Sequence, residues 1–266
     1  MTRILSAVIL IPLVLLVVIF APPVLYLAGI GIIGTVCLYE YSKLMKTMQI
    51  HTRAWLAYCI FWALLVIFYR NIIPAIPALA LTVVAAFTAS IWRKNLTVQQ
   101  RTYGLLAELF GIFYITLFLY PLFPIRFAYG NTAGLQWTLL LLLVTWGGDT
   151  VALFVGKTIG KRPFAPVLSP NKTKEGAIFG LLASIVIAIA LKTFLWNDLP
   201  FRHVIVVSVL LGLFGQLGDL GESMIKRAAG IKDSSQLIPG HGGVLDRMDS
   251  LLFSIPVLYA YLMFIE

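Results

Sequence analysis

The chain has 266 residues, of which 60% are hydrophobic and only 12% are charged, and its mean hydropathy is +0.95. Soluble domains contain about 45–50% apolar and about 25% charged residues, so this composition excludes a water-soluble globular protein and requires lipid as the solvent. The net charge of +9 suggests anionic lipid headgroups as neighbours, and we expect no nucleic-acid partner.

Nine apolar stretches are candidates for membrane spans, because about 20 helical residues cross about 30 Å of hydrocarbon. The first stretch follows Arg3 as in a signal peptide, but another apolar stretch comes at once, so we interpret it as an uncleaved span. Two stretches are short and contain glycine, which leaves eight or ten spans as alternatives. In chain order they are Ile4–Phe20, Val24–Leu38, Ala54–Tyr69, Ile76–Trp92, Leu105–Pro124, Leu135–Val155, Ala177–Trp196, Val204–Leu217 and Leu251–Ile265. The sequence therefore predicts an all-α, polytopic integral membrane protein.

The Lys and Arg residues are distributed unevenly over the predicted loops. Nine spans with a cytoplasmic N-terminus place 16 of the 20 bases on the cytoplasmic side and only Arg70, Arg126, Lys192 and Arg202 on the other. Cytoplasmic loops carry an excess of Lys and Arg, so this distribution predicts a cell-membrane protein with its N-terminus inside and its C-terminus outside.

The polar residues are also unevenly distributed along the chain. Most of the acids lie between Trp146 and Ser250. We expect residues 1–266 to form a single membrane domain, in which 1–130 is mainly apolar helix and 131–266 carries a catalytic site that faces the cytoplasm.

Carboxylates recur at helical spacing in this second part. Asp219, Glu222 and Lys226 are spaced i, i+3, i+7, which places them on one face of a helix that runs out of the eighth span. Asp246 and Asp249 are spaced i, i+3 just before the ninth span. Two helix ends can thus present two carboxylates each to one point, an oxygen donor set that suits one or two Mg²⁺ ions held by Asp219, Asp246 and Asp249. The alternative is that these acids only form ion pairs with the nearby bases Lys226, Arg227 and Arg247.

Two loops have the composition of phosphate-binding segments. Residues 230–243 join the carboxylate-bearing helices, and glycines surround His241, so backbone N–H groups can approach an anion closely. We expect His241 to contact phosphate instead of acting as a general base. The second loop, Ser169–Gly176, contains Lys172, Thr173 and Glu175 at the start of the seventh span. An ordinary tight turn and an ordinary basic cytoplasmic loop are the alternatives for the two segments.

These motifs resemble those of a known enzyme family. Ser223-Met-Ile-Lys-Arg227, Lys232-Asp233 and Pro239-Gly-His-Gly-Gly-Val-Leu-Asp-Arg-Met-Asp-Ser250 together resemble the signature of the phosphatidate cytidylyltransferases, also called CDP-diglyceride synthases. Gly218-Asp-Leu-Gly-Glu222, the Ser169–Gly176 loop and Trp146-Gly-Gly-Asp-Thr150 resemble the family's other polar elements. The chain departs from the family at Asn171, where lysine is common, and keeps Lys172, Thr173 and Glu175.

The resemblance implies a Mg²⁺-dependent nucleotidyltransferase of phospholipid biosynthesis that converts CTP and phosphatidic acid to CDP-diacylglycerol and pyrophosphate. CTP, phosphatidic acid and membrane lipids are then the partners, and a homodimer is compatible with the sequence. The catalytic residues that it implies are Asp219, Lys226, Asp246 and Asp249. The substrate-binding residues are Asp149, Lys172, Thr173, Glu175, Ser223, Arg227, His241 and Arg247.

Three other functions are alternatives to this one. A transporter also has acids in membrane helices, but no inverted repeat is visible in the sequence. A CTP-dependent kinase that acts on a polyprenol is a closer alternative, and it would release CDP instead of pyrophosphate. A purely structural membrane protein does not account for the dense loop motifs.

Overall fold

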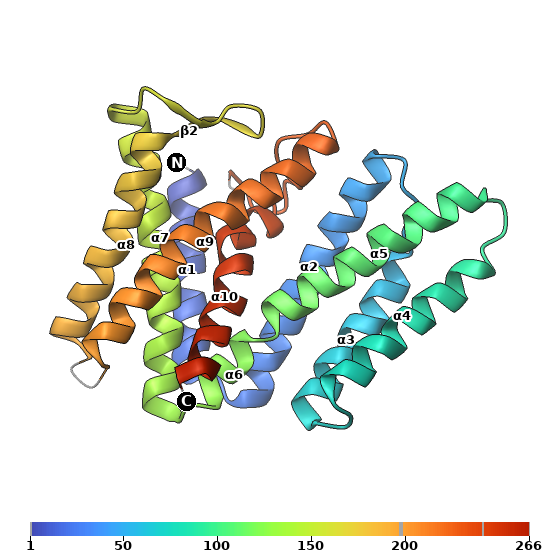
Figure 1. The fold of residues 1–266 in the computed structure, drawn as a ribbon, viewed down its shortest axis with the longest axis horizontal. Coiled ribbons are helices and arrows are strands. Elements are labelled where there is room, and N and C mark those ends of the chain that lie inside the picture. The colour runs from blue at the N-terminus through green and yellow to red at the C-terminus, as the bar shows by residue number, and fades with distance from the viewer. Residues whose placement is uncertain (1, 197–198, 241, 266) are drawn as a thin grey trace.

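The computed structural model describes residues 2–196, 199–240 and 242–265, with side chains from residue 8 onward, and these residues are mainly helical (Figure 1). One short β-hairpin joins the seventh and eighth helices. The elements are α1 Thr2–Phe20, α2 Pro23–Thr47, α3 Ala54–Arg70, α4 Ala75–Ile91, α5 Val98–Leu119, α6 Leu122–Phe127, α7 Asn131–Thr158, β1 Pro163–Ala165, β2 Ser169–Thr173, α8 Lys174–Phe194, α9 Phe201–Ala228 and α10 Leu245–Ile265.

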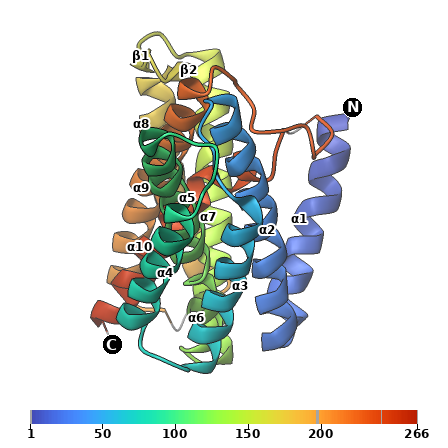
Figure 2. The ribbon, with the colours of Figure 1, turned by 90° about the vertical axis from the view of Figure 1, so that its right-hand side faces the viewer.

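The long helices alternate in direction along the chain. The start of α1 lies toward the same end of the molecule as the β-hairpin and the α9–α10 loop, whereas α10 finishes at the opposite end (Figures 1 and 2). We call the end that carries the hairpin and the α9–α10 loop the hairpin end. The two halves of the carboxylate motif, at the end of α9 and the start of α10, therefore both lie there.

Six helical segments of the described chain are long and apolar enough to cross a membrane. They are Pro23–Thr47, Val98–Phe127, Asn131–Thr158, Lys174–Phe194, Phe201–Ala228 and Leu245–Ile265. The part of α1 with described side chains, Val8–Phe20, and the helices Ala54–Arg70 and Ala75–Ile91 are also apolar but shorter. The prediction of an all-α, multi-pass membrane protein is confirmed, but the count of nine spans is not.

Two helices extend well beyond the apolar stretches that predicted them. The stretch Val24–Leu38 became α2, which continues to Thr47, and Val204–Leu217 became α9, which continues to Ala228. Polar residues such as Glu40 and Glu222 do not interrupt a helix, because glutamate has a high helix propensity. Both extensions carry acids into the protein interior.

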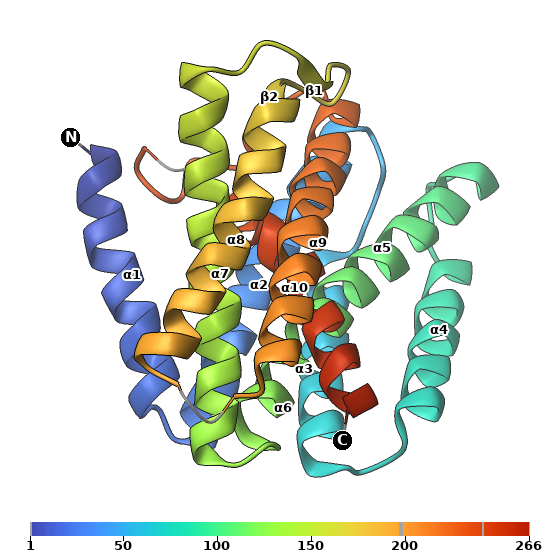
Figure 3. The ribbon, with the colours of Figure 1, turned by 60° about the vertical axis from the view of Figure 1, so that its left-hand side comes forward.

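Small residues let α7, α8, α9 and α10 pack closely, side by side (Figure 3). A Cβ atom at Gly180 would lie 2.8 Å from the Cβ of Ala152, and one at Gly212 would lie 2.7 Å from Leu181 Cδ1. A Cβ atom at Gly218 would collide with the backbone oxygen of Asp249. Helices in lipid associate through such close contacts, since lipid supplies no hydrophobic driving force between them. Gly218 therefore allows α9 and α10 to cross directly beside Asp219.

Candidate active site

A buried lysine joins the end of α9 to the start of α10. Lys226 Nζ lies 3.0 Å from Glu222 Oε1 and 2.7 Å from Asp246 Oδ1, and all three side chains are at most 10% exposed. A buried charge is tolerated only when it is paired and hydrogen-bonded. The two helix ends thus meet, as the spacing of their acids predicts, and a lysine occupies the point where they meet.

The second oxygen of Asp246 is also fully engaged. Asp246 Oδ2 accepts hydrogen bonds from Ser234 N at 2.9 Å, from Ser234 Oγ at 3.0 Å and from Gly243 N at 2.8 Å. Since Oδ1 accepts from Lys226, both oxygens already have partners. Asp246 therefore holds the α9–α10 loop against the end of α9.

Glu40 of α2 lies beside this loop and was missed by the sequence analysis. Its side chain is completely buried and accepts hydrogen bonds from the hydroxyls of Ser234 and Ser235. It also accepts from the backbone N–H groups of Val244 and Leu245. One signal could have found it, because an acid within an apolar helix of a membrane protein is a functional candidate by default.

The β-hairpin supplies a second lysine–carboxylate pair. Lys172 Nζ lies 2.6 Å from Asp219 Oδ2, and the two side chains are 27% and 29% exposed. Ser223 Oγ donates a hydrogen bond of 3.4 Å to Asp219 Oδ1. The exposure leaves this pair open to a ligand, in contrast to the buried pairs around Lys226.

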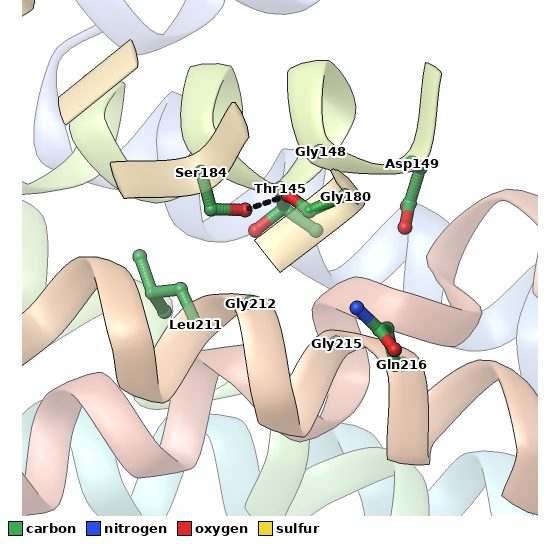
Figure 4. A pocket seen from close by; sticks show the side chains of 9 residues that line it. All are labelled: Thr145, Gly148, Asp149, Gly180, Ser184, Leu211, Gly212, Gly215 and Gln216. Atoms are coloured by element: carbon green, nitrogen blue, oxygen red, sulfur yellow. Dashed lines mark hydrogen bonds between the residues drawn. The ribbon is translucent and has the colours of Figure 1, made fainter. Parts of the chain in front are cut away.

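Asp149 and Asp249 lie near this second pair. The carboxylate of Asp249 is within electrostatic range of those of Asp219 and Asp149, and its Oδ1 accepts a hydrogen bond from Ser250 N at 2.8 Å. Asp149 lines a narrow cavity between α7, α8 and α9, and its side chain and that of Gln216 both project into the space between α7 and α9 (Figure 4). The carboxylates of Asp149, Asp219 and Asp249, which lie on α7, α9 and α10, are therefore close to one another.

The remaining predicted residues hold the hairpin in place. Thr173 caps α8 by accepting a hydrogen bond from Gly176 N at 3.1 Å. Glu175 Oε2 accepts from the backbone N–H groups of Lys161 and Arg162 at 3.1 and 3.2 Å.

Two predicted bases lie at the surface of the hairpin end. Arg227 donates to the carbonyl oxygens of Leu168 and Ile231, which ties the end of α9 to the hairpin. Arg247 is exposed, and the predicted phosphate contact His241 lies outside the described residues.

No group of three or more His, Cys, Asp and Glu side chains in the described part of the chain is arranged to hold a metal ion. The chemistry of the available donors nevertheless fits Mg²⁺, which binds through a few carboxylates and retains several waters. Asp219 and Asp249 supply carboxylate oxygens. Among the described residues, Glu222 Oε2 and the hydroxyl of Thr145 are buried without a hydrogen-bond partner, as expected of groups that bind water or an ion.

These features define a class of protein: a multi-pass membrane protein with a charged, partly open site at one end of its helix bundle. The sequence model of the Cytidylyltransferase family matches residues 1–265, and the chain belongs to that family.

Curated relatives of the chain are named phosphatidate cytidylyltransferase. The relative from Staphylococcus saprophyticus is 42% identical over 128 residues, which are 48% of this chain and 49% of that protein. The relative from Staphylococcus haemolyticus is 46% identical over 125 residues (47% and 48%), and that from Bacillus subtilis is 44% identical over 126 residues (47% of each). The chain spans about half the length of the curated relatives it matches.

Proposed function

We propose that the chain transfers the cytidylyl group of CTP to phosphatidic acid, forming CDP-diacylglycerol and pyrophosphate. Membership of the Cytidylyltransferase family and the names of the relatives support this reaction. The observation that carries the proposal is the convergence of two lysine–carboxylate pairs, Lys172–Asp219 and Lys226–Asp246, at the hairpin end. Of the two lysines, Lys172 is partly exposed and can offer positive charge to phosphates at the place where a membrane lipid exposes its headgroup.

The reaction needs charge neutralisation and positioning more than covalent help from the protein. A phosphate oxygen of the lipid attacks the α-phosphorus of CTP, and the bond from that phosphorus to the oxygen that bridges to the β-phosphate breaks. The attacking oxygen is already an anion, so no general base is required. Lys172 is open to solvent and would offset the repulsion between the two polyanions, and Arg227 and Arg247 would extend the positive surface.

We further propose that Asp219 and Asp249 hold Mg²⁺. Asp246 was also predicted as a ligand, but its side chain is only 5% exposed and accepts four bonds, from Lys226, Ser234 and Gly243. The side chain of Asp219 is 29% exposed and has only Lys172 and Ser223 as described partners. We therefore assign Asp246 to orienting Lys226 and the loop. When bound, the ion would neutralise negative charge on the nucleotide phosphates.

The hairpin end is proposed to face the cytoplasm. Loops and helix ends that lie at this end carry most of the lysines and arginines, which is the distribution of cytoplasmic loops. A soluble nucleotide would enter there, while the acyl chains of phosphatidic acid remain among the helices and the lipid. We also predict that a second copy of the chain and further membrane lipids are partners.

The test is product analysis with purified protein, CTP, phosphatidate and Mg²⁺. Equal amounts of pyrophosphate and CDP-diacylglycerol support the proposal, and Asp219→Asn should abolish both. Glu108→Gln is a matched control, since Glu108 is a buried carboxylate that pairs with Arg53 at 3.2 Å on another set of helices. CDP formed with a polyprenol acceptor would indicate a kinase, and no nucleotide product at all would favour a transporter.

A further inference from the structure

The carboxylate of Glu40 binds a part of the chain that is about 200 positions away. Glu40 Oε1 accepts hydrogen bonds from Ser235 Oγ at 2.5 Å and Val244 N at 3.0 Å, and Oε2 accepts from Ser234 Oγ at 3.0 Å and Leu245 N at 2.7 Å. Each oxygen thus takes one hydroxyl and one backbone donor. Hydrogen bonds to a charged acceptor are about twice as strong as those between neutral groups.

Two of these bonds cap helix α10. The helix begins at Leu245, and the first N–H groups of any helix have no partner within it. Glu40 accepts from the N–H groups of Val244 and Leu245, and its negative charge lies at the positive end of the helix dipole. A residue of α2 therefore caps the helix that carries Asp246 and Asp249.

The other bonds connect Glu40 to the lysine of the site. The Ser234 hydroxyl lies 3.0 Å from both Glu40 Oε2 and Asp246 Oδ2, and a hydroxyl has only one proton to donate, so the two carboxylates share it. Asp246 in turn binds Lys226. A Cβ atom at Gly243 would lie 2.6 Å from Glu40 Oε1 and would also collide with Ser234 Oγ, so only glycine fits against this bridge.

We infer that Glu40 is a positioning residue of the proposed cytidylyltransferase: it fixes the start of α10 and the loop before it, and so places Asp246 against Lys226 and Asp249 beside Asp219. Its buried carboxylate has no contact with the open pair Lys172–Asp219 among the interactions described, so it acts through the residues it holds. The catalytic part of this inference rests on the proposed function.

The first test separates positioning from substrate binding. Glu40→Gln keeps the size of the side chain but removes its charge and one acceptor, and a misplacement of about 1 Å in an active site can lower kcat about 100-fold. We expect kcat to fall by about that factor, with the KM values for CTP and phosphatidate changed by less than about threefold. Glu40→Asp retains the carboxylate, and its kcat should be at least about tenfold higher than that of Glu40→Gln.

Glu108→Gln is the control, because it also removes one fully buried carboxylate charge, from the pair with Arg53. Thermal unfolding in detergent shows whether Glu40→Gln and Glu108→Gln are equally stable. A Glu40→Gln enzyme with the kcat of the wild type, or with a loss no greater than that of Glu108→Gln, overturns the inference.

The second test does not depend on activity. Hydrogen exchange of the backbone amides in residues 243–247 of the wild type and of Glu40→Gln reports directly on the cap. We expect exchange to be faster by about tenfold in the variant, since the N–H groups of Val244 and Leu245 lose a charged acceptor. Unchanged exchange overturns the inference. A wild type that releases no pyrophosphate refutes the proposed function alone, and the exchange result still decides the role of Glu40.

Discussion

Removing the charge of Lys226 should destabilise the protein strongly. Lys226 lies within 3.0 Å of Glu222 and 2.7 Å of Asp246, and its own side chain is only 10% exposed. In Lys226→Met, two buried carboxylates lose their only cationic partner among the described contacts. Breaking one buried pair costs about 3–5 kcal/mol, which lowers the unfolding temperature of a chain of this size by about 6–20 °C.

A double variant shows whether the loss comes from unpaired charge. Asp246 keeps three donors from Ser234 and Gly243, whereas Glu222 keeps none in the described structure, so most of the cost should arise at Glu222. Lys226→Met/Glu222→Gln should therefore unfold at a higher temperature than Lys226→Met alone, in a thermal scan of tryptophan fluorescence in detergent. Unfolding of Lys226→Met within about 2 °C of the wild type would refute the stabilising role of Lys226. A double variant that unfolds at no higher temperature than Lys226→Met would refute unpaired charge as the cause.

Further variants test other contacts. Gly218→Ala should destabilise by about 1–3 kcal/mol and lower kcat, because its Cβ collides with the backbone of Asp249; Gly221→Ala, whose Cβ would make an ordinary contact at 3.4 Å, should do neither. Lys172→Ala should raise the KM for CTP or phosphatidate by about tenfold, and unchanged KM values would remove its phosphate role. Thr173→Ala should cost about 1 kcal/mol in a thermal scan through loss of the α8 cap, and an unchanged melting temperature would show that the cap is dispensable. EDTA should abolish turnover and added Mg²⁺ should restore it; activity that survives EDTA would refute the metal proposal.

The apolar composition was sufficient to predict the class of fold. Every apolar stretch contains a helix, since a backbone in lipid must satisfy its own hydrogen bonds. The number of spans was harder to predict, because α3 and α4 have only 17 residues each and no sequence pattern defines where lipid begins. The end of α2 after Leu38 lies outside the predicted span for the same reason, whereas Asp219, Glu222 and Lys226 were predicted to lie on a helix that continues out of the eighth span.

The candidate site was predicted in part. The spacing of Asp219, Glu222 and Lys226 places them on one face of a helix, and the structure brings that face to the start of α10. Glu40 could not be assigned to the site from local pattern, because its partners are about 200 residues away and only the packing of α2 against the α9–α10 loop brings them together. The same applies to Lys172, whose pairing with Asp219 depends on how the β-hairpin folds over α9.

The position of the ³²P label in the products tests most directly whether the protein transfers the cytidylyl group of CTP to the lipid. Purified protein is incubated with phosphatidate, Mg²⁺ and CTP that carries ³²P at either the α- or the γ-phosphorus. Transfer of the cytidylyl group at the Lys172–Asp219 and Lys226–Asp246 site predicts that α-label enters the lipid fraction and γ-label leaves as pyrophosphate, and that neither occurs in Asp219→Asn. γ-Label in the lipid fraction, or transfer of α-label by Asp219→Asn at the wild-type rate, would contradict cytidylyl transfer at this site.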